Sequence, residues 1–240
     1  PRVKQKILFS ATIGKEIENL IKNFLKDSYR VEIAPSATIT KNVKQILLLT
    51  NFGGKLIKKK NFLISSLKQD KVLINAIIFC NRKKEVSNLF NLLKNNGLGA
   101  GEIHGDLEQK SRMEIVKDFK AGKIKYLVAS DVAARGLDIP DVSHVINFDV
   151  PLNPEDYVHR IGRTGRAGKQ GIAITLATES EKPLIRSIET LINENLNHSS
   201  KQWPELPYKG SKQKITSSKS PVVKKANNLN TLPDFLFTKF

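Results

Sequence analysis

Three arginines lie within the seven residues 160–166, Arg-Ile-Gly-Arg-Thr-Gly-Arg, and at most one residue separates each of them from a glycine. Arginine carries a permanent charge on a planar fork of donors that suits phosphate oxygens. Glycine lets the backbone come close to a ligand. A solvated basic turn would have the same composition. A second dense run, Ser-Asp-Val-Ala-Ala-Arg-Gly-Leu-Asp, precedes it at 130–138. Together the two runs favour a surface that binds phosphate.

The elements that must position these residues alternate between strand and helix along the chain. Strands are predicted at 44–50, 75–80, 100–103, 124–129, 143–148 and 171–177. Helices are predicted at 54–69, 82–96, 108–120, 153–161 and 179–195. Such alternation is typical of an α/β fold with a parallel sheet covered by helices on both faces. The strands at 75–80 and 143–148 are apolar on both faces, as central parallel strands are.

The candidate phosphate-binding residues are expected at one edge of this sheet. Ser130 and Arg82 each lie within two residues of the end of a predicted strand, and the segment 159–166 follows the helix that comes after another. Open α/β sheets bind ligands at the carboxyl ends of their strands. We therefore expect these segments to converge at that edge.

The charge balance restricts the partner. The 240 residues contain 40 Lys and Arg against 23 Asp and Glu, a net charge of +17, which favours nucleic acid first and a membrane surface second. The single cysteine, Cys80, excludes an internal disulfide and a cysteine zinc site. No apolar run approaches the ~20 residues of a membrane span, and no signal peptide is visible. We therefore expect a cytoplasmic protein that binds no membrane and no metal of its own.

The two runs also resemble those of a known family. The segment 130–139 (SDVAARGLDI) resembles motif V of the DEAD-box RNA helicases, and 159–168 (HRIGRTGRAG) resembles their motif VI. His159 favours this branch, because related helicases of other families tend to carry Gln there. Ser-Ala-Thr at 10–12 resembles motif III. The resemblance covers residues 1–197 and points to the bacterial RhlE-like type.

The resemblance implies a RecA-like fold and divides the chain into four regions. These are the remnant of a first RecA-like domain at 1–34, a linker at 35–42, the second RecA-like domain at 43–198 and a basic tail at 199–240. The linker is small and polar and starts with a proline. The tail is rich in lysine and is expected to be disordered. Within the first region, apolar runs predict strands at 7–10 and 29–33 and a helix at 14–26.

The nucleotide is expected between this chain and a first domain. No Gly-x-x-x-x-Gly-Lys-Ser/Thr phosphate loop and no Asp-Glu-Ala-Asp occur in the 240 residues, so ATP and its Mg²⁺ are expected on the missing first domain. The resemblance makes Arg163 and Arg166 arginine fingers, which stabilise charge on a transferred phosphoryl group. It makes Asp138 a contact to the ribose and His159 a catalytic link to the first domain. Taken alone, His159 and Asp138 fit an ordinary helix surface and a turn better.

Further residues are expected to couple the two domains. They are Ser10, Thr12 and Arg160. The resemblance places Arg160 in motif VI without fixing its role. Thr12 also lies where the N-cap of helix 14–26 would be useful, so a structural role stays open for it.

RNA contacts are expected mostly with phosphate and sugar. The candidates are Ser130, Gln109, Arg112 and Arg82. Ser130 takes the hydroxyl position of motif V, and the segment 104–112 (HGDLEQKSR) resembles the family's HGD…QxxR element. Asp106 and Gln109 also fit a capping box that would open helix 108–120, so cap and RNA contact are equal alternatives for Gln109. Arg82 lies in a segment that resembles motif IV, where many relatives carry Thr.

These expectations give one main function and one alternative. The main prediction is the C-terminal part of an ATP-dependent RNA helicase that couples ATP hydrolysis to local unwinding of RNA or remodelling of RNA–protein particles, inactive as this chain alone. The alternative is a stand-alone RNA-binding or regulatory module from a truncated helicase gene, without ATPase activity. The expected partners are RNA and the N-terminal RecA-like domain, and the protein is expected to be a monomer.

Overall fold

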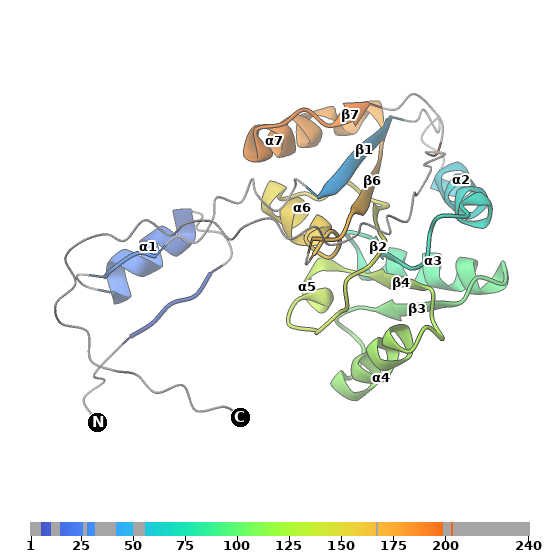
Figure 1. Cartoon of the computed structure of the whole chain (residues 1–240), viewed down its shortest axis with the longest axis horizontal. Helices are drawn as coiled ribbons and strands as arrows, with labels where there is room; N and C mark the ends of the chain where they lie inside the picture. Colours follow the sequence, from blue (N-terminus) through green and yellow to red (C-terminus); the bar gives the residue numbers. More distant parts are fainter. Residues whose placement is uncertain are drawn as a thin grey trace, which may run out of the picture. The chain divides into compact units, whose positions relative to one another are not determined.

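A parallel β-sheet forms the centre of the chain (Figure 1). The computed structural model describes residues 6–10, 15–25, 28–31, 42–49, 56–166, 168–198 and 203. Within them, seven strands lie in the order β3-β4-β2-β5-β6-β1-β7, and every pairing is parallel. The strands are β1 (Val43–Leu49), β2 (Ala76–Phe79), β3 (Ala100–Ile103), β4 (Tyr126–Ala129), β5 (His144–Asn147), β6 (Gly171–Ala177) and β7 (Asn197–His198). The six strands predicted after residue 43 are present, and the two-residue β7 is additional.

Helices connect the strands, as the alternating pattern predicts. They are α1 (Lys15–Phe24), α2 (Leu56–Gln69), α3 (Lys83–Asn95), α4 (Gln109–Lys120), α5 (Asp131–Ala134), α6 (Pro154–Ile161) and α7 (Lys182–Ile192), with a 3₁₀ turn η2 at Glu179–Glu181. Only α5 was not predicted. In the described part of the chain, no helix is long and apolar enough to cross a membrane.

The two faces of the sheet bury alternate residues of each strand. Ile78 lies beside Ile146 and Val128 in the register and packs with α2 and α3. Its neighbour Ile77 lies beside Val145 and packs with α4 and α5 on the other face, where α6 and α7 cover the β1–β6 half. Successive side chains of a strand point to opposite faces, so a doubly covered sheet requires strands without polar alternation. The predicted fold class is confirmed.

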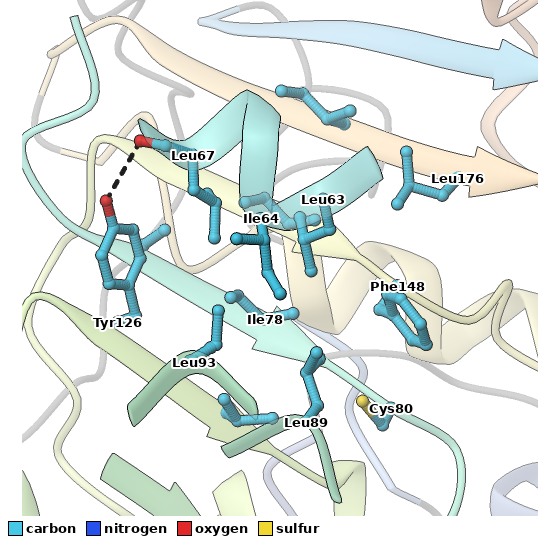
Figure 2. Close-up of a cluster of buried hydrophobic side chains, with 14 of the residues drawn as sticks. Leu63, Ile64, Leu67, Ile78, Cys80, Leu89, Leu93, Tyr126, Phe148 and Leu176 are labelled. Atoms are coloured by element: carbon cyan, nitrogen blue, oxygen red, sulfur yellow. Dashed lines mark hydrogen bonds between the residues drawn. The ribbon is translucent and has the colours of Figure 1, made fainter. Parts of the chain in front are cut away.

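The layer under α2 and α3 is a continuous apolar cluster (Figure 2). Leu63 and Leu67 of α2 meet Leu89 and Leu93 of α3 over the sheet, and each is at most 2% exposed. Cys80 belongs to this cluster, and burial raises the pKa of its thiol well above the usual range. A thiol without thiolate character is a poor nucleophile. Cys80 therefore acts as a small core residue.

The first region of the chain differs from its prediction. The helix expected at 14–26 is present as α1. No strand forms at residues 6–10, where Phe9 is 92% exposed, and none forms at 28–31. A strand needs a neighbouring chain for its ladder hydrogen bonds, and neither segment belongs to the sheet formed by the described strands. The strands predicted at 7–10 and 29–33 are thus wrong for the residues described. Most of the predicted linker and tail lies outside the described residues.

Trp203 is attached to the amino-terminal edge of the sheet through Asp70. Its indole N–H donates to Oδ2 of Asp70 at 2.7 Å, and its ring meets Phe62 edge-on at 6.4 Å. The same carboxylate oxygen lies 3.9 Å from Nε2 of His144, whose side chain is 3% exposed. Burial lowers the pKa of His144 to about 4, although Asp70 opposes the change, and Lys125 lowers the pKa further. The buried imidazole is therefore neutral near pH 7.

We expect acid to destabilise the fold through His144. Its folded pKa of about 4 lies below the ordinary value of 6.5, so the unfolded chain binds more protons between these values. The free energy of unfolding should therefore be highest above pH 6.5 and fall by about 2 kcal/mol down to pH 5. Urea titrations that follow Trp203, the only tryptophan, would measure this fall. In His144→Gln the difference between pH 7.5 and pH 5 should shrink, and an unchanged difference would contradict the assignment.

Candidate functional site

Four strands end in register at the carboxyl edge of the sheet. Ile103, Ala129, Phe79 and Asn147 lie side by side as the last residues of β3, β4, β2 and β5. The chain leaves each strand at the same level, so the side chains that follow come from four separate parts of the sequence. In this order of strands, β5 lies on the opposite side of β2 from β3 and β4. Open α/β sheets bind ligands where the strand order reverses in this way.

One group of predicted residues follows these strand ends, and we call it the carboxyl-edge surface: Arg82, Gln109, Arg112 and Ser130. Ser130 precedes α5 and forms no side-chain cap bond there. Arg82 and Gln109 are exposed at the beginnings of α3 and α4. Arg112 donates to the carbonyls of Leu107 and Gly105 at 2.9 and 3.1 Å. Two of its N–H groups thus hold the loop that presents Gln109.

The capping box proposed for Gln109 is not formed. The N-cap of α4 is Glu108, with no side-chain cap hydrogen bond. Both oxygens of Asp106 instead lie 2.9 Å from Nζ of Lys83, which lowers the pKa of that carboxyl group. Lys83, which follows β2, has therefore taken the carboxylate that the cap required. Gln109 is left without a capping role.

The arginine segment lies elsewhere than predicted. Helix α6 leads the chain from the end of β5 back along the sheet, so the loop 162–166 reaches the beginning of β5. There the N–H of Val142 donates to the carbonyl of Arg163 at 3.0 Å, and Thr164 bridges to Val142. The backbone of the last residues of segment 159–166 therefore lies away from the carboxyl edge, whereas the side chain of Arg163 lines a depression with Phe79, the last residue of β2, and Asp131, which follows β4, at that edge, as expected. The length of α6 separates the loop from the end of β5, which precedes this helix.

Glycine shapes the arginine loop by allowing close packing. Gly165 has φ +72°, and a Cβ there would lie 2.7 Å from Cγ2 of Val43. A Cβ on Gly171 would lie 2.3 Å from Oγ1 of Thr164. Real Cβ atoms do not approach other atoms so closely, so a methyl group at either position would displace the loop. These two glycines serve the backbone packing of the loop.

A second group of predicted residues gathers around this loop, and we call it the arginine-loop surface: Asp138, His159, Arg163 and Arg166. Arg163 is half-buried in a small depression that His159 and Asp131 also line. Arg166 is exposed and donates from Nε to the carbonyl of Gly162 at 2.6 Å. Burial and the charge of Arg166 lower the pKa of Arg163. The charge of Arg166 thus acts on the guanidinium group of Arg163.

Neither guanidinium group has an acidic partner in the described part of the chain, although the backbone N–H of Arg166 donates to Oδ1 of Asp141 at 3.3 Å. Among the described residues, no carboxylate forms an ion pair with Arg163 or Arg166. The charge of Arg166 disfavours the charged form of Arg163, and a bound anion would relieve that repulsion. The arginine-loop surface is therefore suited to bind a polyanion.

The carboxylate of Asp138 lies within the field of Arg166. It is 92% exposed and accepts a hydrogen bond from Nζ of Lys120 at 2.6 Å. That hydrogen bond is the main cause of the lowered pKa of Asp138, and the charge of Arg166 adds to it. Asp138 is thus an ionised acceptor beside the arginines, as a contact to hydroxyl groups requires.

His159 offers a nitrogen without a partner. Its Nδ1 is buried, and no described group forms a hydrogen bond with it. A buried polar atom of this kind costs stability until a donor or acceptor meets it.

Ser10 is exposed in the first region, and Thr12 lies outside the described residues. Their predicted coupling roles therefore stay predictions.

Arg160 is internal, and its predicted role in coupling the two domains stays a prediction. The residue is 1% exposed. Its Nε and Nη2 donate to the two oxygens of Asp131 at 2.7 Å each, and Nη2 also donates to Oδ1 of Asn81 at 2.7 Å. Its Nη1 donates to the carbonyl of Asp149 at 2.7 Å and to Oδ1 of Asn147 at 3.4 Å. A guanidinium has five N–H donors, and all five are used inside this domain.

Several residues of this network were missed by sequence reasoning. Asp149 follows β5 as Ser130 follows β4, so the same rule about strand ends could have identified it. Its carboxylate accepts the N–H of Asn81 at 3.0 Å, and burial raises the pKa of that carboxyl group. Gln45 lies inside β1 and accepts the buried hydroxyl of Tyr157 at 2.7 Å. No pattern in the sequence marks that pair.

Comparison with known proteins gives the family. The domain family described as "Helicase conserved C-terminal domain" matches residues 58–168. The ATP-dependent RNA helicase RhlB of Shewanella oneidensis is 40% identical over 198 residues, 82% of this chain and 44% of that protein. The DEAD-box ATP-dependent RNA helicase CshA of Bacillus subtilis is 38% identical over 230 residues, 96% of this chain and 45% of that protein. The chain thus spans less than half the length of these curated relatives.

Solved structures agree. The E. coli DEAD-box protein SrmB, bound to regulator of ribonuclease activity A, is 36% identical with a TM-score of 0.61, covering 66% of this chain and 91% of that one. S. cerevisiae Dbp5, bound to RNA and ADP BeF3, is 29% identical with a TM-score of 0.73, covering 83% of this chain and 52% of that one. The RhlE-like type stays a prediction. The chain belongs to the DEAD-box RNA helicases, as the C-terminal RecA-like half.

Proposed function

We propose that the full-length protein hydrolyses ATP in order to unwind short RNA duplexes or remodel RNA–protein particles, and that this chain supplies half of each binding surface. The observation that carries the proposal is the pair of guanidinium groups of Arg163 and Arg166: neither forms an ion pair among the described residues, Arg166 acts on the charge of Arg163, and the ionised Asp138 lies in the field of Arg166. A triphosphate held by another domain would provide the missing negative charge.

The arginine-loop surface would act on the nucleotide. Negative charge develops on the oxygens of the transferred phosphoryl group, and arginine fingers stabilise it. Arg163 and Arg166 would do this from the side opposite the phosphate loop. Asp138 would accept hydrogen bonds from the ribose once Lys120 yields its place. Mg²⁺ would be held by the first domain, since the described residues of this chain contain no group of three or more metal-ligating side chains.

The carboxyl-edge surface would bind the RNA backbone. Ser130 presents a hydroxyl group, and Arg82, Gln109 and Arg112 present N–H donors along three neighbouring strand ends. Contacts of this kind bind phosphate and sugar, so they position the strand without reading its sequence. Binding should weaken with salt, because each neutralised phosphate releases counterions.

The region boundaries at 34, 42 and 198 and the cytoplasmic location belong to the same proposal. The break after residue 42 is supported by the beginning of β1 at Val43, and the break after residue 198 by the end of β7 at His198. A cytoplasmic location is supported by the buried free thiol of Cys80, which needs no oxidising compartment.

Assays of the full-length protein and of the 240-residue chain would test this function. With RNA present, the full-length protein should hydrolyse ATP and separate short RNA duplexes, whereas the chain alone should show no turnover because it has no phosphate loop. Turnover by the chain alone would contradict the proposal. Equal unwinding of DNA duplexes would indicate a DNA helicase. A full-length protein without a phosphate loop would favour the stand-alone RNA-binding module.

A further inference from the structure

Two ion pairs of opposite polarity join α5 to α6. Asp131 at the beginning of α5 binds Arg160 near the end of α6, through both carboxylate oxygens at 2.7 Å. Arg135, the C-cap residue of α5, binds Asp156 near the beginning of α6. The pairing is antiparallel, so each helix carries one acid and one arginine. Sliding either helix along the other would separate both pairs.

We call Asp131–Arg160 the inner pair and Arg135–Asp156 the outer pair. The inner pair contributes most to holding α6 against α5. Arg160 is 1% exposed, and its remaining donors bind Asn81, Asn147 and the carbonyl of Asp149. The side chain of Arg135 is 52% exposed. Solvent screens an exposed pair, whereas a buried pair that loses one partner leaves an uncompensated charge. We therefore expect the Asp131–Arg160 pair to fix the position of α6 and the outer pair to assist it.

Residues of the two surfaces lie directly beside this pair. Ser130 of the carboxyl-edge surface precedes Asp131, and its N–H donates to the carbonyl of Ile103 at 3.1 Å. Arg163 of the arginine-loop surface follows Arg160 by one helical turn, and its N–H donates to the carbonyl of Arg160 at 3.1 Å. Asp131 also lines the depression that holds Arg163. One carboxylate–guanidinium contact thus joins the two surfaces.

We infer that the Asp131–Arg160 pair couples the two surfaces: RNA phosphate at Ser130 fixes α5, and the pair then fixes Arg163 where it meets the triphosphate. Asp131 and Arg160 are positioning residues, since they bind each other through both carboxylate oxygens and the other donors of Arg160 are used within the domain. The inference rests on the proposed function of both surfaces. Coupling between two binding sites is reciprocal, so nucleotide must tighten RNA binding by the factor by which RNA tightens nucleotide binding.

The test measures coupling apart from binding. In the full-length protein, RNA affinity would be measured with and without a non-hydrolysable ATP analogue, together with the stimulation of ATP hydrolysis by RNA. Asp131→Asn should retain RNA affinity without nucleotide, yet lose about tenfold in the tightening by the analogue and in the stimulation. Asp156→Asn, on the outer pair, should lose about two- to threefold. Asp118→Asn breaks an exposed pair with Lys123 and should change neither quantity.

Each outcome decides the inference. A folded Asp131→Asn protein with wild-type tightening and stimulation would overturn it. Equal loss of RNA affinity with and without the analogue would also overturn it, because Asp131 would then serve RNA binding alone. If Asp131→Asn does not fold, Asp156→Asn decides: unchanged coupling overturns the inference, and a partial loss supports it. A wild-type protein without RNA-stimulated hydrolysis would instead refute the proposed function, which separates the two failures.

Discussion

Replacing Arg163 or Arg166 with alanine in the full-length protein is expected to slow ATP hydrolysis by about 10³-fold or more, the contribution of an arginine finger. The reason is geometric. Neither guanidinium group forms an ion pair among the described residues, and Arg166 uses only its Nε within the loop, so donors of both remain for phosphate oxygens. Affinity for RNA without nucleotide should change little, because neither side chain belongs to the carboxyl-edge surface. Steady-state hydrolysis and RNA titrations on the same preparations would measure both quantities.

Two further variants make this prediction specific. Arg163→Lys keeps the charge but loses the planar fork, so hydrolysis should stay well below the wild-type rate. Arg186→Ala removes an exposed arginine from α7 and should leave hydrolysis unchanged. If Arg163→Ala and Arg166→Ala weakened RNA binding as much as hydrolysis, the two arginines would be RNA contacts and their role as fingers would be excluded.

The second large effect is expected on stability. Arg160→Ala should lower the free energy of unfolding of the 240-residue chain by about 3–5 kcal/mol, as breaking a buried ion pair does. The loss leaves the carboxylate of Asp131 without its partner and deprives Asn81 and the carbonyl of Asp149 of donors. It also removes the guanidinium that lies 5.2 Å from the centre of the Phe79 ring. Urea denaturation followed by circular dichroism would measure the change.

Arg135→Ala is the matched control for this effect. It removes an arginine from the same pair of helices, but its side chain is 52% exposed, so the loss should stay below about 1 kcal/mol. Equal losses in the two variants would mean that the burial of Arg160 contributes nothing. Together the variants separate the stability of the domain from the coupling inferred above.

The strands and the longer helices could be predicted because each leaves a local pattern. Apolar runs predicted β2 and β5. Both strands lie inside the sheet and are buried on both faces, so they carry no polar alternation. Helix α5 was missed because its four residues are too few to show helical periodicity. The strand at 7–10 was predicted from an apolar run alone, and an apolar run does not supply the neighbouring strand that a ladder requires.

The site could be predicted only in part, for a related reason. The motifs predict which residues face ligands, because residue types such as paired arginines indicate their chemistry. They did not reveal that Arg160 differs from Arg163 and Arg166, since its acceptors come from the ends of β2 and β5 and from α5. Likewise, Asp106 could not be assigned to Lys83 from sequence alone, because the two lie at the ends of different strands.

The tight fit of Gly165 against Val43 and of Gly171 against Thr164 bears on how tightly the arginine loop can bind a nucleotide. The backbone of the arginine loop is already fixed by these contacts and by the hydrogen bond from Val142 to Arg163. Little conformational entropy is then lost there when the nucleotide arrives, so more of the binding energy remains as affinity. Only the side-chain torsions of Arg163 and Arg166 have to settle.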